Sequence, residues 1–261
     1  MSKMVKFVWN MRWTQANNLW TQQDVEFIFR NFQILEKKFM EILNVFPLSE
    51  QNENSWSPEL VNLFLDISSM FDSISRNIVG KGKDSNDSIP IHTERRTISK
   101  KVKDLDINDF ERSLFRAIDL LDSRVVIYVY PASVLTPLED YKLPNGWWSI
   151  YNSLKHNRVK NYKKATLKNT LKALASLFLL LARYKEEEFT LAMFRFHWFD
   201  TGTVPEYVHS DRLKFKNLWY DSELFGTHEV AANIFSNNIT KIRPPSIGSK
   251  RFQIFVRRYN Q

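Results

Sequence analysis

A chain of 261 residues with 43% hydrophobic and 14% aromatic content can fold as one large domain or two small ones around a substantial core. It contains no cysteine, which excludes disulfides, thiolate zinc sites and cysteine nucleophiles and is typical of a reducing cytoplasm. The formal net charge of +8 predicts an anionic partner.

The sequence lacks the short motifs of several large enzyme classes. No GxGxxG, GxxxxGKS/T or GxSxG occurs, so nothing supports a dinucleotide-binding fold, a P-loop NTPase or a serine hydrolase. The five histidines show no HxxxH or HExxH spacing, and we predict neither a metal nor a cofactor. The stretch 1–20 has no signal-peptide core, and the apolar run 173–182 is shorter than the roughly 20 residues of a membrane span. We therefore expect a soluble, cytoplasmic protein.

Hydrophobic periodicity predicts two long helices in the first third of the chain. Over 24–46, apolar residues recur every three or four positions, as in a helix of about six turns with one wide buried stripe. Ser57 and Pro58 form the next helix start, with Ser57 as the N-cap and Pro58 at the first helical position. Gly80 and Gly82 are expected to end this second helix.

Weaker patterns follow. The polar stretch 81–103 lacks periodicity and is expected to be an exposed loop or a partly ordered insertion. The segment 107–121 is predicted to be helical, and the β-branched and aromatic segment 124–130 favours a strand. We further predict a short helix around 148–158, a long helix over 164–185, and a terminal strand over 251–259.

Together these elements predict a mainly α fold, a helical bundle with a short β element and a mixed C-terminal extension. We divide the chain into an N-terminal extension (1–23), a helical domain (24–185) with an insertion near 80–104, and a basic C-terminal extension (186–261). The cations of the acid-free tail after Glu229 either extend a basic surface or pair with an acidic partner protein.

The net charge is concentrated in one segment. From Tyr141 to Lys185 there are ten Lys and Arg residues and no Asp or Glu, whereas the rest of the chain holds 27 basic and 29 acidic residues. Near its start, the sequence WWSIYNSLKHNR places His156 among cations and aromatic rings. Such a histidine can transfer a proton while the cations stabilise charge on a phosphoryl oxygen. Alternatively, the aromatic residues belong to the core and His156 caps a buried polar group.

The sequence WWSIYNSLKHNR, followed by NYKKATLKNTLKALASLFLLL, resembles the HEPN-like superfamily of bacterial helical proteins, which are frequent in toxin–antitoxin and anti-phage systems. The resemblance covers about 24–185 and includes the helix SPELVNLFLDISSMFDSI. It implies an RNA-directed protein with a HEPN-like bundle, which commonly forms a homodimer across the motif helix. It also implies an antitoxin or another defence-system protein as a partner.

Catalytic members of this superfamily carry Arg, then a polar residue, then about three further residues and His, and they cleave RNA without a metal. Here Asn152 occupies the polar position and His156 the histidine position, but Tyr151 stands where the arginine is expected. Tyrosine cannot offer the cationic fork of a guanidinium to a phosphate. Two outcomes stay open: either Arg158 or Lys155 supplies the charge in an active endoribonuclease, or the chain has lost the chemistry and binds RNA or a partner subunit.

The same segment is a candidate surface for single-stranded nucleic acid, because cations follow phosphates while aromatic rings stack on bases. The candidate residues are Trp147, Trp148, Lys160, Lys163, Lys164 and Lys168. A solvated basic face beside core aromatics is the alternative. On a neighbouring helix, Asp72 either orients His156 or pairs with Arg76 four residues further on, and we favour the pair with Arg76.

Overall fold

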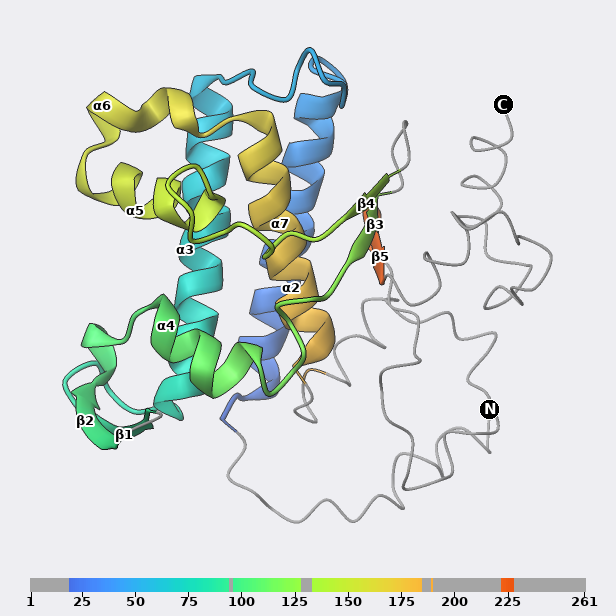
Figure 1. The fold of residues 1–261 in the computed structure, drawn as a ribbon. Helices are drawn as coiled ribbons and strands as arrows, with labels where there is room; N and C mark the ends of the chain where they lie inside the picture. Colours follow the sequence, from blue (N-terminus) through green and yellow to red (C-terminus); the bar gives the residue numbers. More distant parts are fainter. Residues whose placement is uncertain (1–18, 94–95, 128–132, 185–188, 190–221, 228–261) are drawn as a thin grey trace, which may run out of the picture.

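The computed structural model describes residues 19–93, 96–127, 133–184, 189 and 222–227, and they form a mainly helical fold, as predicted (Figure 1). Three long helices form the bundle: α2 (Gln22–Leu43), α3 (Pro58–Gly80) and α7 (Leu167–Arg183). The shorter helices α5 (Trp147–His156) and α6 (Arg158–Asn161) lie at one edge of it. Small antiparallel sheets complete the described part of the chain.

Local chemistry sets the start of α2. Thr21 and Asp24 form a capping box, in which each side chain accepts a hydrogen bond from the backbone N–H of the other residue. The helix ends at Leu43, about one turn before the predicted limit. Its buried apolar stripe agrees with the predicted one and consists of Val25, Ile28, Phe29, Phe32, Leu35 and Phe39.

The predicted start of α3 is confirmed. The Ser57 side chain accepts a hydrogen bond from the Leu60 N–H, and Pro58 occupies the first helical position. The helix includes Gly80 and ends because Lys81 and Gly82 adopt left-handed backbone angles, with φ of 54° and 66°.

Helix α7 contacts α2, α3, α5 and the strand β5 (Phe225–Thr227). The apolar run 173–182 of this helix, too short to span a membrane, is buried at every residue. The reason is that β5 covers a side that the helices leave open. Phe178 of α7 and Phe225 of β5 make this contact, with ring centroids 5.5 Å apart.

The prediction of an exposed loop or a partly ordered insertion over 81–103 is wrong for most of this stretch, which contains an antiparallel hairpin of β1 (Ser88–His92) and β2 (Thr97–Lys101). Residues alternate along β1, with Ile89 and Ile91 buried in the core and their neighbours exposed. A strand that buries only one face needs few apolar residues, so the polar composition of this stretch did not indicate a hairpin.

The predicted helix over 107–121 is shorter than expected. It begins as α4 (Ile107–Phe110), whose N-cap forms a capping box, and continues as the π-helical turn η2 (Glu111–Phe115). Asp119 adopts a positive φ of 52°, which is incompatible with a continuing right-handed helix. The sequence therefore identifies the start of this helix and overestimates its length.

The predicted strand at 124–130 is present as β3 (Val125–Ile127) within the described residues. It is the middle strand of an antiparallel sheet with the order β4–β3–β5, in which β4 is Ser133–Leu135. Because β5 comes from the C-terminal extension, part of that extension packs on the bundle. The predicted terminal strand over 251–259 lies outside the described residues.

A buried carboxylate connects α2 to the segment that contains β5. Glu36 is 2% exposed and accepts hydrogen bonds from Ser222 Oγ and from the backbone N–H groups of Glu223 (3.3 Å) and Leu224 (3.0 Å). Burial raises the pKa of Glu36 to about 7, although the hydrogen bonds favour the ionised form. One titratable side chain therefore contributes to the position of β5.

Candidate nucleic-acid interface

The two tryptophans of the motif lie in the core. Trp147 is fully buried and Trp148 nearly so, and both pack edge-on against Phe71 of α3, with ring centroids 5.2 and 6.1 Å away. Trp147 Nε1 donates to the Pro137 carbonyl oxygen at 3.1 Å, which satisfies the one polar atom of the indole. The prediction that Trp147 and Trp148 bind nucleic acid is wrong, because buried rings cannot stack on bases. They anchor α5 to α3.

A close backbone contact sets the start of α5. The Trp148 N–H donates to the Tyr141 carbonyl oxygen at 3.1 Å, and a Cβ added at Gly146 would lie 2.1 Å from the Asp140 carbonyl oxygen. Glycine is therefore required at this N-cap. The contact fixes the direction in which α5 leaves the preceding loop, so that its first turn enters the core and its last two residues, Lys155 and His156, are exposed.

Tyr151, at the position where the resemblance places an arginine, is buried against α3. Burial and the nearby Asp72 carboxylate raise the pKa of Tyr151 to about 12. Asp72 forms the predicted ion pair with Arg76 at 2.8 Å and a longer one with Lys155 at 3.6 Å. The Lys155 ammonium also lies 5.6 Å from the centre of the Tyr151 ring. The interpretation of Asp72 as the partner of Arg76 is confirmed, and its carboxylate is occupied by cations other than His156.

His156 and Arg158 are both exposed at the junction of α5 and α6. Asn157, between them, leaves the helical conformation with φ −150° and ψ 79° and caps α6. The Arg158 guanidinium donates a hydrogen bond to Asn62 Oδ1 of α3, which fixes one end of the short helix to the bundle. The imidazole is thus accessible to solvent at the surface of the protein.

The five predicted catalytic residues have different surroundings. Asn152 is half-buried on α5, one turn before His156. Tyr151 and Lys155 gather around Asp72, whereas His156 and Arg158 lie at the exposed helix junction.

An aromatic pair that the sequence does not predict lies beside the basic segment. Trp56, in the loop before α3, packs edge-on against Tyr162 with ring centroids 4.7 Å apart. The Lys163 ammonium lies 5.9 Å from the centre of the Trp56 ring and 6.0 Å from that of Tyr162, within reach of a cation–π interaction with both. Trp56 is 37% exposed, so part of its ring is open to solvent. No local sequence pattern connects two rings so far apart in the chain.

The start of α7 holds the loop that carries Trp56. The backbone N–H groups of Leu167 and Lys168 donate to the carbonyl oxygens of Ser55 (2.9 Å) and Glu53 (3.0 Å). These are among the N–H groups that have no partner within a helix. Lys168 Nζ also pairs with the Glu53 carboxylate at 2.7 Å. Its charge is therefore partly satisfied within the protein, which weakens its predicted role as a phosphate contact.

We call the exposed region around these rings the basic–aromatic surface. It consists of Trp56, His156, Arg158, Lys160 and the short helix η3 (Tyr162–Lys164). Lys160, Lys163 and Lys164 are exposed and form no ion pair with any other residue that the structure describes. The surface combines three available ammonium groups with an exposed indole, which suits an anionic partner that carries flat rings.

Among the described residues, no group of three or more acidic and histidine side chains could hold a metal ion. Within the same ranges, no single helix is long and apolar enough to cross a membrane, and one bent pair, Arg158–Lys164 with α7 at 88°, passes on length and composition only. Comparisons with protein-family models, curated proteins and solved structures found no match to this chain.

Proposed function

We propose that this chain is an RNA-directed protein that binds single-stranded RNA at the basic–aromatic surface. The observation that carries the proposal is the exposed Trp56 ring, packed against Tyr162 with the Lys163 ammonium beside both rings. Proteins hold single strands in this way, with cations along the phosphates and rings stacked on the bases. The helical bundle and the resemblance of its motif support a HEPN-like protein of a bacterial defence or toxin system.

The expected size of the interaction follows from these side chains. One base stacked on Trp56 contributes about 1–3 kcal/mol. Each phosphate contact on a single strand contributes about −0.7 to the slope of log affinity against log salt concentration. With Lys160, Lys163 and Lys164 engaged, the slope is about −2. Binding should therefore strengthen measurably as the salt concentration falls.

Fluorescence anisotropy with a labelled RNA of about ten nucleotides tests the proposal. Trp56→Ala should weaken binding about tenfold, because it removes one stacking contact. Lys163→Ala should weaken binding and reduce the salt slope by about 0.7 in magnitude.

Two controls lie away from this surface, where Lys37 is an exposed cation of α2 and Val45, just after α2, an exposed apolar side chain. Val45→Ala and Lys37→Ala should bind RNA like the wild type. Unchanged affinity in both Trp56→Ala and Lys163→Ala would contradict the assignment of the surface. A protein that binds no RNA at any salt concentration would support the alternative, a HEPN-like module that docks a partner subunit.

The exposed imidazole of His156, beside Arg158 at the same helix junction, favours one further candidate activity. We propose that His156 transfers a proton during metal-independent cleavage, while Arg158 stabilises charge on the phosphate. In this reaction the RNA 2′-oxygen bonds to the adjacent phosphorus, the bond from phosphorus to the 5′-oxygen breaks, and the proton moves from the 2′-hydroxyl to the leaving oxygen. Tyr151 has no part in this proposal, because the residue is buried against α3 and beside Asp72.

Cleavage is tested with purified protein and EDTA across pH values from about 5 to 8. His156→Ala should abolish cleavage and leave RNA binding nearly unchanged, whereas His92→Ala, at an exposed histidine on β1, should cleave like the wild type. Cleavage that persists in His156→Ala would exclude this histidine as the catalyst. Binding without cleavage at any of these pH values would leave RNA binding as the function.

A further inference from the structure

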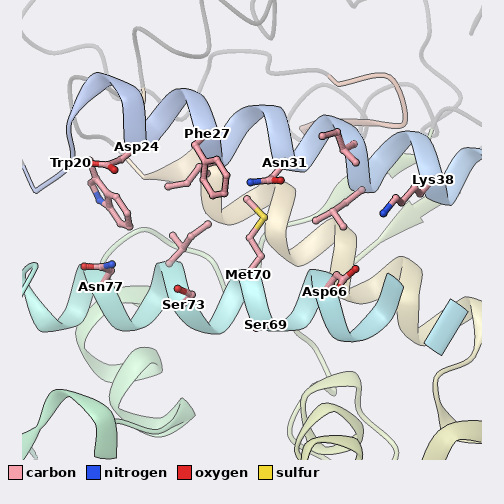
Figure 2. Close-up of a pocket in the computed structure, with 14 residues that line it drawn as sticks. Trp20, Asp24, Phe27, Asn31, Lys38, Asp66, Ser69, Met70, Ser73 and Asn77 are labelled. Atoms are coloured by element: carbon pink, nitrogen blue, oxygen red, sulfur yellow. The ribbon is translucent and has the colours of Figure 1, made fainter. Parts of the chain in front are cut away.

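A groove of about 450 Å³ lies between α2 and α3 and is open to solvent (Figure 2). Figure 2 shows Trp20, Asp24 and Asn77 at one end of it and Lys38 with Asp66 at the other. The two helices run antiparallel, since the start of α2 lies beside the end of α3. The groove shares no residue with the basic–aromatic surface.

Two large apolar side chains of α2 line the groove although they are open to solvent. Phe27 is 68% exposed and Ile34 is 52% exposed. They are seven residues apart, about two helical turns, and therefore share one face of α2. Neither belongs to the stripe that α2 buries in the core. Exposed apolar side chains that line a groove between helices are typical of a docking site for an apolar segment.

The N-terminal segment 1–18 joins the protein at one end of this groove. Trp20 lines that end, and Leu19 packs so closely on Gly82 that a Cβ added there would lie 2.8 Å from Leu19 Cδ1. As a helix, 18 residues would extend about 27 Å, whereas the part of α2 from Asp24 to Lys38 extends about 21 Å. The segment is therefore long enough to cover the groove.

The sequence of 1–18 matches the groove in spacing and charge. Met4 and Met11 are seven residues apart, like Ile34 and Phe27, so a helix antiparallel to α2 would place Met11 near Phe27 and Met4 near Ile34. The segment contains three cations and no acid. The groove is lined by two acids, Asp24 and Asp66, and by one cation, Lys38. Asp66 is exposed and has no ion-pair partner in the described part of the chain.

We propose that the segment 1–18 docks in the α2/α3 groove of its own chain as a basic amphipathic helix, antiparallel to α2. The tether at Leu19 makes docking an intramolecular event, so its extent is independent of protein concentration. Docking removes Phe27 and Ile34 from water and places cations of the segment near Asp66. The proposal does not depend on RNA binding.

Because the chain has no cysteine, a pair of introduced cysteines reports a single contact in the full-length protein. Met4→Cys with Ile34→Cys should be joined within one chain by a short bismaleimide. The matched control is Met4→Cys with Val45→Cys, since Val45 is 71% exposed just after α2 and does not line the groove. It should give several times less cross-linked monomer. Equal yields from the two pairs would overturn the proposal.

Limited proteolysis gives an independent measurement without cysteines. Trypsin should cleave after Arg12 about tenfold faster in Ile34→Glu than in the wild type. Docking would bury the introduced carboxylate, so the segment shifts to its undocked form, and trypsin cleaves only that form. Val45→Glu should leave the rate unchanged. Equal rates in the wild type and Ile34→Glu would overturn the proposal. Cross-linked dimers, or protection that rises with protein concentration, would also overturn it by assigning the groove to a second copy.

Discussion

Replacing Glu36 by glutamine tests the contact that holds the C-terminal strand β5 near α2. The Glu36 carboxyl is buried and accepts hydrogen bonds from the Ser222 hydroxyl and from the backbone N–H of Leu224. Burial raises its pKa to about 7, compared with the ordinary value of 4.5 that we take for the unfolded chain. The folded protein therefore binds this proton more tightly than the unfolded chain does.

The sign and size of the effect on stability follow from that difference. The stabilisation from the bound proton is complete below pH 4.5 and is lost as the pH rises through about 7. A tenfold difference in proton affinity corresponds to about 1.4 kcal/mol, so the wild type loses about 3 kcal/mol of unfolding free energy across this window. Glutamine does not titrate and keeps a constant contribution.

Urea unfolding of the wild type and Glu36→Gln at pH values from 4.5 to about 8 measures this loss. The difference in unfolding free energy between the two proteins should shift by about 3 kcal/mol against the wild type as the pH rises. All other titrating groups are common to both proteins, so their contributions to this difference cancel. Glu41→Gln, at an exposed acid of the same helix, should show no such shift. A Glu36→Gln variant with the pH profile of the wild type would refute the reasoning.

Three further substitutions, one of them with a second glycine as its control, test the packing of the bundle by urea unfolding. Arg76→Met removes the ion pair with Asp72 and the hydrogen bonds to three backbone carbonyl oxygens after the hairpin. It should lower the free energy of unfolding by about 3 kcal/mol, and a loss below about 1 kcal/mol would contradict this role of Arg76. Gly146→Ala should lower the free energy of unfolding by about 2 kcal/mol or more, because its Cβ would clash with backbone atoms. Gly80→Ala should lower it less, since the added Cβ would meet only the Val102 side chain, at 3.0 Å. Phe71→Ala removes a fully buried ring between two indoles and should cost about 3–5 kcal/mol, so a nearly neutral effect would rule out the aromatic cluster as a core.

The long helices could be predicted because their signals are local. The stripe of α2 and the Ser57–Pro58 start of α3 depend on residues within a few positions of each other. The hairpin over 88–101 could not, since its strand pairing and its two buried isoleucines depend on the bundle beneath them. Likewise, β5 lies far along the chain from its partner β3.

The candidate site shows the same division. The excess of cations between Tyr141 and Lys185 can be read from the sequence, and Lys160, Lys163 and Lys164 are indeed exposed. The sequence could not show which aromatic rings accompany them. Trp147 and Trp148 are adjacent to the cations in the chain but lie in the core, whereas Trp56 reaches them from another loop.

By itself, the amino-acid sequence determined the mainly helical class of this protein, the start of α3 and the single segment that carries its net charge, because periodicity, capping and charge act over short distances. Only the tertiary structure decided which side chains of that segment are available to a partner. Burial against α3 removes both indoles and Tyr151 from the surface, since the apolar rings are more stable in the core than in water. The hydrogen bonds at the start of α7 bring Trp56 to the basic segment, where it is exposed.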